Sequence, residues 1–215
     1  MPYKRRYYKK RVPKKKSFLQ KALPVAQKAF KIAKFVAGAI NPEYKYNLAS
    51  ASLIVPTWNG SVTTLVDPTQ GSGATQRTGD SIRMKDLVLR LVLDYNTLGV
   101  AEMVRFIIFI DKQNVITTAS QLLQTTGVYL STESEKNEDN KYLTKVLLDK
   151  TIMVSANKPQ SKFKWLYQFK KPFHTHYTAG TATITNNAIK LCVISQNPTY
   201  SAKYSYIMRS SYLDN

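Results

Sequence analysis

From about residue 48 onward, apolar and polar side chains alternate with a period of two, and turn-forming residues interrupt the pattern at short intervals. The alternation is clearest over residues 161–170, where aromatic side chains occupy every second position: Phe163, Trp165, Tyr167 and Phe169. The positions between them include Lys162, Lys164, Gln168 and Lys170. Because successive side chains on a strand point to opposite faces, this segment is predicted to be a half-buried antiparallel strand with an aromatic inner face and a basic outer face.

The same alternation predicts further strands in the rest of the chain. They are expected at residues 53–58, 61–66, 81–95, 103–111, 142–154, 161–171, 188–195 and 203–213, with short pieces near 48–55 and 181–185. Asn59-Gly60, between the first two, favours the two positive φ angles of a type I′ turn, so these two strands are predicted to form a hairpin. About eight antiparallel strands in two packed sheets describe an all-β, eight-stranded jelly-roll sandwich, expected over residues 43–215.

Residues 17–42 follow a helical period instead. At about 100° per residue their polar side chains fall within one arc of roughly 140°, and apolar side chains fill the opposite side. Ser17 is placed to cap a helix, Pro24 suits a first helical turn, and Pro42 lies where the pattern ends. This segment is therefore predicted to be a short amphipathic basic helix.

The positive charge of the chain is concentrated at its N-terminus. The net charge is +19, and residues 1–42 hold thirteen of the 32 Lys and Arg side chains with no acid. The remaining residues carry nineteen cations against thirteen acids, which is ordinary for a mildly basic globular domain. A surplus of this size implies a polyanionic partner such as nucleic acid or an anionic membrane.

Residues 1–16, called the arm below, combine cations with tyrosines and have few other apolar side chains. Such a segment cannot bury enough surface to offset the entropy of ordering, so the arm is predicted to be disordered until it binds an anion. Its cations can neutralise phosphates, and its rings can stack on unpaired bases. A solubilising tail is the alternative, and the basic clusters also fit a nuclear import signal. The candidate nucleic-acid-binding residues are Tyr3, Lys4, Arg5, Arg6, Tyr7, Tyr8, Lys9, Lys10, Arg11, Lys14, Lys15 and Lys16.

No pattern of residues predicts an enzyme. There is no G-x-x-x-x-G-K-[ST] segment, the glycines at 71, 73 and 79 lack G-x-G-x-x-G spacing, and no nucleophile can be paired with a base. The absence of a secretory leader or of 18 consecutive apolar residues predicts a chain that stays inside the cell and spans no bilayer. Cofactors are not expected.

Three features could carry metal or redox chemistry, and each has a plainer interpretation. His174 and His176 would share one face of a strand, as a metal pair or as polar surface histidines. The acids Glu133, Glu135, Glu138 and Asp139 fit a solvated loop, or a calcium contact between subunits. The lone Cys192 cannot form an intramolecular disulfide and is expected to be a small buried residue. No metal site is predicted.

The order of these features resembles the single jelly-roll capsid proteins of small circular single-stranded DNA viruses that encode a replication initiator, and the expected coat fold is similar to that of satellite necrosis-type particles. The resemblance runs from the arm through GATQRTGDSIRMKDLVLRLVL and VRFIIFIDKQN to a Tyr-rich last strand ending SSYLDN. Within these stretches, Arg77 to Ile82 looks like the family's "R-x-G-x-x-I" entry into its third strand. Arg105 lies in its "R, hydrophobic run, D" strand.

The resemblance implies a coat protein that forms an icosahedral shell of sixty identical subunits, packages circular single-stranded DNA and reaches the host nucleus. Under this hypothesis the protein's partners are other copies of itself, the genome and the nuclear import machinery. The helix at residues 17–42 then has three open roles: packing on the inner shell surface, contacting a membrane, or docking on the body. Two other classes remain open, a ribosomal-type host protein that binds nucleic acid and a membrane-active or lectin-like jelly roll.

Overall fold

The computed structural model describes residues 44–96, 100–125, 131–197 and 202–214. The chain divides into two units, residues 1–42 and 43–215. The arm and the predicted amphipathic helix fall in the first unit, outside the described residues, so their boundaries at residues 16 and 42 stay predictions. Everything below concerns the second unit.

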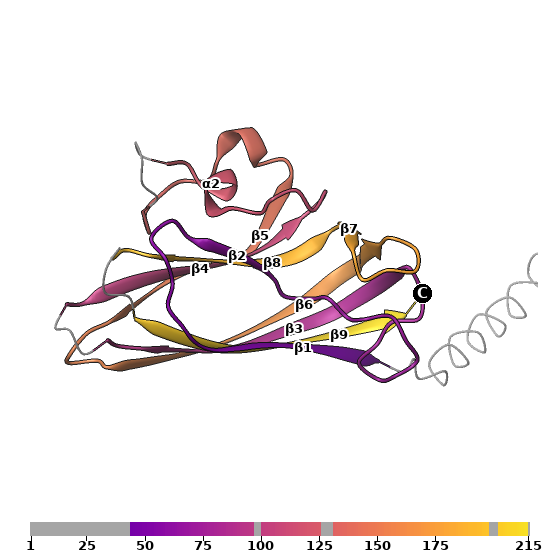
Figure 1. Ribbon diagram of the computed structural model, residues 1–215, viewed down its shortest axis with the longest axis horizontal. Coiled ribbons are helices and arrows are strands. Elements are labelled where there is room, and N and C mark those ends of the chain that lie inside the picture. The colour runs from indigo at the N-terminus through magenta and orange to yellow at the C-terminus, as the bar shows by residue number, and fades with distance from the viewer. Residues whose placement is uncertain (1–43, 97–99, 126–130, 198–201, 215) are drawn as a thin grey trace, which may run out of the picture. The chain divides into compact units, whose positions relative to one another are not determined.

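The second unit is a jelly roll of two antiparallel sheets, which confirms the predicted fold class (Figure 1). One sheet has the order β1-β9-β3-β6-β7, and the other has the order β2-β8-β4-β5. Strand β7 is short, with three residues, and it pairs only with the end of β6. The strands are β1 (Lys45–Ile54), β2 (Ser61–Thr64), β3 (Ser81–Asp94), β4 (Glu102–Asp111), β5 (Thr144–Val154), β6 (Gln160–Tyr177), β7 (Ile184–Asn186), β8 (Ala188–Ser195) and β9 (Lys203–Asp214).

The predicted hairpin around Asn59-Gly60 is wrong. Strand β1 pairs with β9 and strand β2 with β8, so the turn carries the chain from one sheet to the other. Of the two turn residues only Gly60 has a positive φ, 71°, whereas a type I′ turn needs two. A side chain at Gly60 would also place its Cβ 2.4 Å from the Cβ of Ala119. The glycine therefore serves a crossover and a close approach rather than a hairpin.

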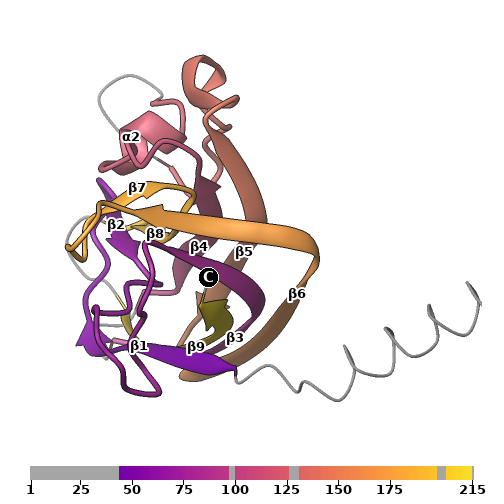
Figure 2. The same cartoon turned by 90° about the vertical axis from the view of Figure 1, so that its right-hand side faces the viewer.

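The main core fills the space between the two sheets. In β6 the burial pattern alternates as predicted, with the four aromatic side chains half-buried against this core and the lysines exposed. The rings of Trp165, Tyr167 and Phe169 contact one another in turn along the strand, with centroids 5.6 and 5.0 Å apart. Figure 2 shows β6 curving from its partner β3 toward the other sheet, so this one strand closes a side of the sandwich.

A second, smaller core lies on the outer face of the four-stranded sheet. Two described parts of the connection between β4 and β5, residues 112–125 and 131–143, fold over this face and are together called the cover below; they include α2 (Ala119–Leu122) and η1 (Glu138–Asn140) (Figure 1). Ile107 and Phe109 of β4 are buried under the cover, while Phe106 and Ile108 point into the main core. Because both faces of β4 are buried, its sequence is a continuous apolar run rather than an alternating one.

Two charged residues at the ends of that run fasten the cover to the sheet. Arg105 donates two hydrogen bonds of 2.8 Å to the Asp149 carboxylate, and it also donates to the carbonyls of Thr132 and Ser134. The hydrogen bond to Asp149 raises the pKa of Arg105, so this guanidinium stays charged. At the other end, the buried Asp111 accepts hydrogen bonds from the Lys190 ammonium and from the backbone N–H of Ile116. The "R, hydrophobic run, D" pattern is therefore a pair of anchors for the cover.

The stretch from Arg77 to Ile82 has an equally specific structural role. Arg77 is fully buried, lies 4.0 Å from the ring centre of Tyr177, and donates hydrogen bonds to the carbonyls of Gly79 and Thr181. It thereby joins the entry of β3 to the loop that follows β6, and Ile82 starts the buried face of β3. Burial raises the pKa of the Asp67 carboxyl, although Arg77 opposes the shift.

Candidate nucleic-acid interface

The outer face of the five-stranded sheet carries most of the exposed cations of the body. Outside one register shift between β3 and β6, its strands alternate, so about every second side chain of β3, β6 and β9 points away from the core. We call this surface the basic face. It is defined by nine exposed side chains: Arg83, Lys85, Arg90, Lys162, Lys164, Lys170, Lys171, Lys203 and Arg209.

Few acids balance these cations. By strand alternation the carboxylates on the same face are Asp86 and Asp94, both half-buried, and Asp94 accepts a 2.7 Å hydrogen bond from Gln160. Arg90 lies directly opposite Lys164 in the register of β3 and β6. Like charges in this position destabilise an antiparallel pair. An anion bound on the face would remove that cost.

Aromatic and apolar groups lie among the cations. The Lys85 ammonium sits 3.7 Å from the ring centre of Tyr44, and the Arg209 guanidinium sits 5.2 Å from that of Tyr46. Ile207 is 54% exposed beside a shallow groove of about 540 Å³. The groove is lined by Ser50, Ala51, Ser52, Arg90, Val92, Ser205, Tyr206 and Ile207. Cations that neutralise phosphates, next to apolar surface that accepts bases, form the combination that single-stranded nucleic acid requires.

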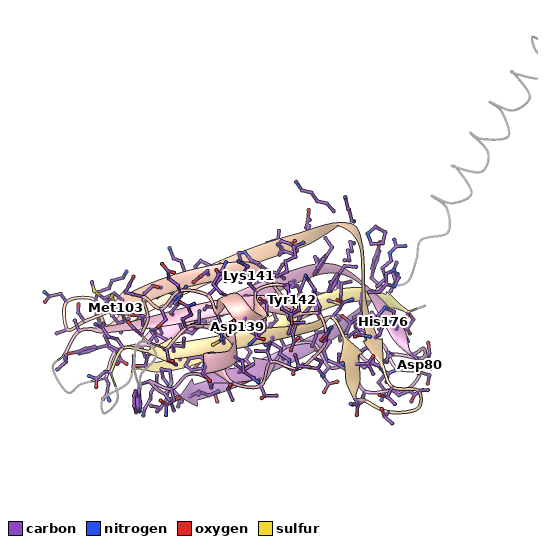
Figure 3. All side chains as sticks on the ribbon, turned by 90° about the horizontal axis from the view of Figure 1, so that it is seen from above. Asp80, Met103, Asp139, Lys141, Tyr142 and His176 are labelled. Carbon is purple, nitrogen blue, oxygen red and sulfur yellow. The ribbon has the colours of Figure 1, made fainter. Side chains whose placement is uncertain are left out.

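The opposite side of the sandwich has a different charge. The cover exposes four carboxylates, Glu133, Glu135, Glu138 and Asp139, against the lysines at 112, 136 and 141. Lys141 pairs with Glu138, and Figure 3 shows Asp139, Lys141 and Tyr142 lying over the sheet on this side. The acidic stretch is thus exposed to solvent, as its plainer interpretation predicted. The two outer faces of the molecule therefore differ in charge.

Within the described part of the chain, no group of three or more His, Cys, Asp or Glu side chains could hold a metal ion. His174 and His176 share one face of β6, as predicted, with ring centroids 6.3 Å apart. Figure 3 places His176 near Asp80 at one end of the molecule, in agreement with the pairing of Ser81 and His176. In the same part of the chain, no helix is long and apolar enough to cross a membrane. Cys192 is buried, as expected, and burial raises the pKa of its thiol to about 12.

Sequence reasoning found only part of this interface. The predicted binding residues Tyr3 to Lys16 all lie outside the described residues, so their role stays a prediction. The alternating pattern identifies Lys162, Lys164 and Lys170 as a basic strand face, but it does not connect the cations of β3 and β9 with them. Alternation groups Arg83 with Lys85 but would put Arg90 on the opposite face of the strand; the register shift between Met84 and Asp86 turns all three outward. The missing information was that β3 lies between β6 and β9.

A comparison with models of protein families decides which class of protein this is. Residues 23–215 match the family of the satellite tobacco necrosis virus coat protein. The chain belongs to this family of viral coat proteins. The predicted coat function and the likeness to satellite necrosis-type particles are confirmed at this level, and the family places the coat protein in the virion. The finer likeness to circular DNA viruses is not tested by the match.

Solved structures similar to this coat protein are distant. They include Desmodium yellow mottle tymovirus (14% identity, 80% of this chain and 87% of that chain, TM-score 0.40) and Broad bean stain virus (11% identity, 80% and 86%, TM-score 0.37). The top component of Cowpea mosaic virus, described as naturally occurring empty particles, has 8% identity over 77% and 84% of the two chains, with a TM-score of 0.36. This likeness concerns the fold alone. No curated protein sequence matches the chain.

Proposed function

We propose that this coat protein assembles into a closed icosahedral shell and packages single-stranded DNA, with the basic face turned toward the interior. The observation that carries the orientation is the charge difference between the two outer faces. The basic face carries nine exposed cations and two half-buried carboxylates, whereas the cover carries four exposed carboxylates and three lysines. A polyanion enclosed in the shell is stabilised next to the basic face and not next to the cover.

The arm is proposed to supply most of the packaging energy. It adds nine cations and three tyrosines within sixteen residues, and contacts of cations with phosphates are independent of base sequence. Binding by the arm and the basic face together should therefore be steeply dependent on salt and tolerant of sequence. The function is structural, and no reaction is proposed for it.

Four details of the proposal rest on the resemblance and on the first 42 residues. A DNA genome and a shell of sixty subunits follow from the resemblance to coat proteins of circular DNA viruses. Transport to the host nucleus follows from the basic clusters of the arm. Membrane contact by residues 17–42 follows from their amphipathic pattern.

Electron microscopy and nuclease digestion of the purified full-length protein test the proposal. We expect closed particles of uniform size, and the extracted nucleic acid should be degraded by a DNase and resist an RNase. Light scattering that shows only monomers or dimers, across a range of salt and with nucleic acid present, would contradict assembly. Nucleic acid that is degraded only by RNase would leave the coat function intact and replace DNA with RNA.

A second experiment separates the arm from the basic face. Particles that lack residues 1–16 should still form, because the truncation removes none of the strands, but their 260 to 280 nm absorbance ratio should fall. The full-length variant with Arg90→Gln and Lys164→Gln should show a smaller fall at the same salt concentration. An unchanged ratio for the truncated particles would assign packaging to the basic face instead of the arm.

A further inference from the structure

A β-bulge in the five-stranded sheet opens a cavity at the edge of the basic face. In the pairing of β3 with β6, the register passes from Met84 opposite Phe173 to Asp86 opposite Gln168. Two steps along β3 thus correspond to five steps along β6, so residues 169–172 leave the regular ladder. Pro172 has no N–H and therefore loses no ladder hydrogen bond in this position. The cavity has a volume of about 240 Å³.

Four cations line this cavity: Arg83, Lys85, Lys170 and Lys171. Lys170 and Lys171 are consecutive, and on a regular strand they would point to opposite faces. The bulge is what allows both to line the same cavity. No carboxylate lines it, and among the described residues none forms an ion pair with any of the four cations. The cavity therefore concentrates positive charge that the described part of the protein does not neutralise.

The size and the walls of the cavity select a type of ligand. A volume of about 240 Å³ corresponds to roughly eight water molecules, which is enough for a phosphate group with part of its sugar. The ring of Tyr44 forms one wall, is 40% exposed, and offers an aromatic surface beside the cations.

We infer that this bulge cavity binds a backbone phosphate of single-stranded nucleic acid through Arg83, Lys85, Lys170 and Lys171. The inference rests on the proposed function and adds a defined site to it. The rest of the basic face presents cations on regular strands, where they act as a diffuse field. The cavity gathers four cations around one phosphate, so it fixes the position of the nucleic acid on the subunit.

Lysine acylation of the full-length protein, read residue by residue by mass spectrometry, tests this site directly. With a short oligothymidylate at about four times its Kd, acylation of Lys170 and Lys171 should slow about fivefold, because about a fifth of the protein is then unbound. Lys162 and Lys164, on the same strand and face but outside the cavity, should change by less than about twofold. Equal protection of all four lysines would overturn the inference. Protection by inorganic phosphate, with none by the oligonucleotide, would assign the cavity to a small free anion and also overturn it.

A matched pair of variants gives a second measurement. Fluorescence anisotropy with a labelled oligothymidylate should show affinity about 25-fold lower at 0.1 M salt for Lys170→Gln with Lys171→Gln, and a salt slope shallower by about 1.4. Lys145→Gln with Lys150→Gln removes the same charge at two exposed positions of β5, outside the basic face, and should stay within about threefold of the native protein. Equal losses in the two variants would mean that only total charge matters. If the native chain binds no oligonucleotide at all, the proposed function itself fails, whereas binding without protection of the cavity refutes only the site.

Discussion

Replacing Lys190 with methionine should destabilise the protein more than any replacement of an exposed lysine. The Lys190 ammonium lies 2.8 Å from the Asp111 carboxylate and 2.7 Å from the carbonyl oxygen of Ile116, and the two side chains of the ion pair are 5% and 0% exposed. Methionine fills a similar volume but leaves a buried carboxylate without its cation. Breaking a buried pair from one side costs about 3–5 kcal/mol.

Equilibrium urea unfolding, followed by tryptophan fluorescence, measures this loss. With a denaturant slope of about 2–3 kcal/mol per molar, the midpoint of Lys190→Met should fall by about 1–2 M urea. Lys150→Met removes an exposed lysine of β5 and should change the free energy of unfolding by no more than about 0.5 kcal/mol. All proteins must be compared at one concentration, because assembly couples stability to concentration.

The double variant Lys190→Met with Asp111→Asn identifies the cause of the loss. An asparagine side chain can still accept the hydrogen bond from the N–H of Ile116, and no buried charge remains. The double variant should therefore recover about 2 kcal/mol or more relative to the sum of the two single losses. Additive losses, or a loss for Lys190→Met no larger than that for Lys150→Met, would refute the view that this pair anchors the cover.

Three further predictions concern other buried groups. Because burial raises the pKa of Cys192 to about 12 from a value of 9.0, a thiol reagent at pH 8 should react about a thousandfold more slowly with the native protein than with the urea-unfolded chain. Arg77→Lys should lower the free energy of unfolding by about 2 kcal/mol in the same urea assay, because a lysine cannot reach both carbonyls and stack on Tyr177. Partial burial raises the pKa of Asp214, but hydrogen bonds from Lys45 and Thr78 outweigh it and hold the pKa below 3.8. Its charged form thus stabilises the fold above pH 3.8, so Asp214→Asn should be less stable than the native protein at pH 7 and should lose that difference as the pH falls through the lowered pKa.

Local patterns predicted much of the body, because the signal for a strand lies in its own residues. The alternation in residues 161–170 predicted the burial of β6 correctly, and the clustered cations of the arm indicate a polyanionic partner through composition alone. The Asn59-Gly60 pair shows where local reasoning fails. The same two residues suit a hairpin or a crossover, and the choice depends on β8 and β9, which pair with the flanking strands from more than a hundred residues away.

The sequence by itself determined the jelly-roll class, the division of charge between arm and body, and the alternation that sends cations outward, since each depends on neighbours along the chain. Only the tertiary structure decided that β3 lies between β6 and β9, and it thereby gathered cations from three separate segments into one basic face. It also decided that residues 112–125 and 131–143 cover the other sheet, and that a bulge between β3 and β6 brings four cations around one cavity. Strand pairing is a non-local choice, made by the burial of many side chains at once, and so no single segment of the sequence contains it.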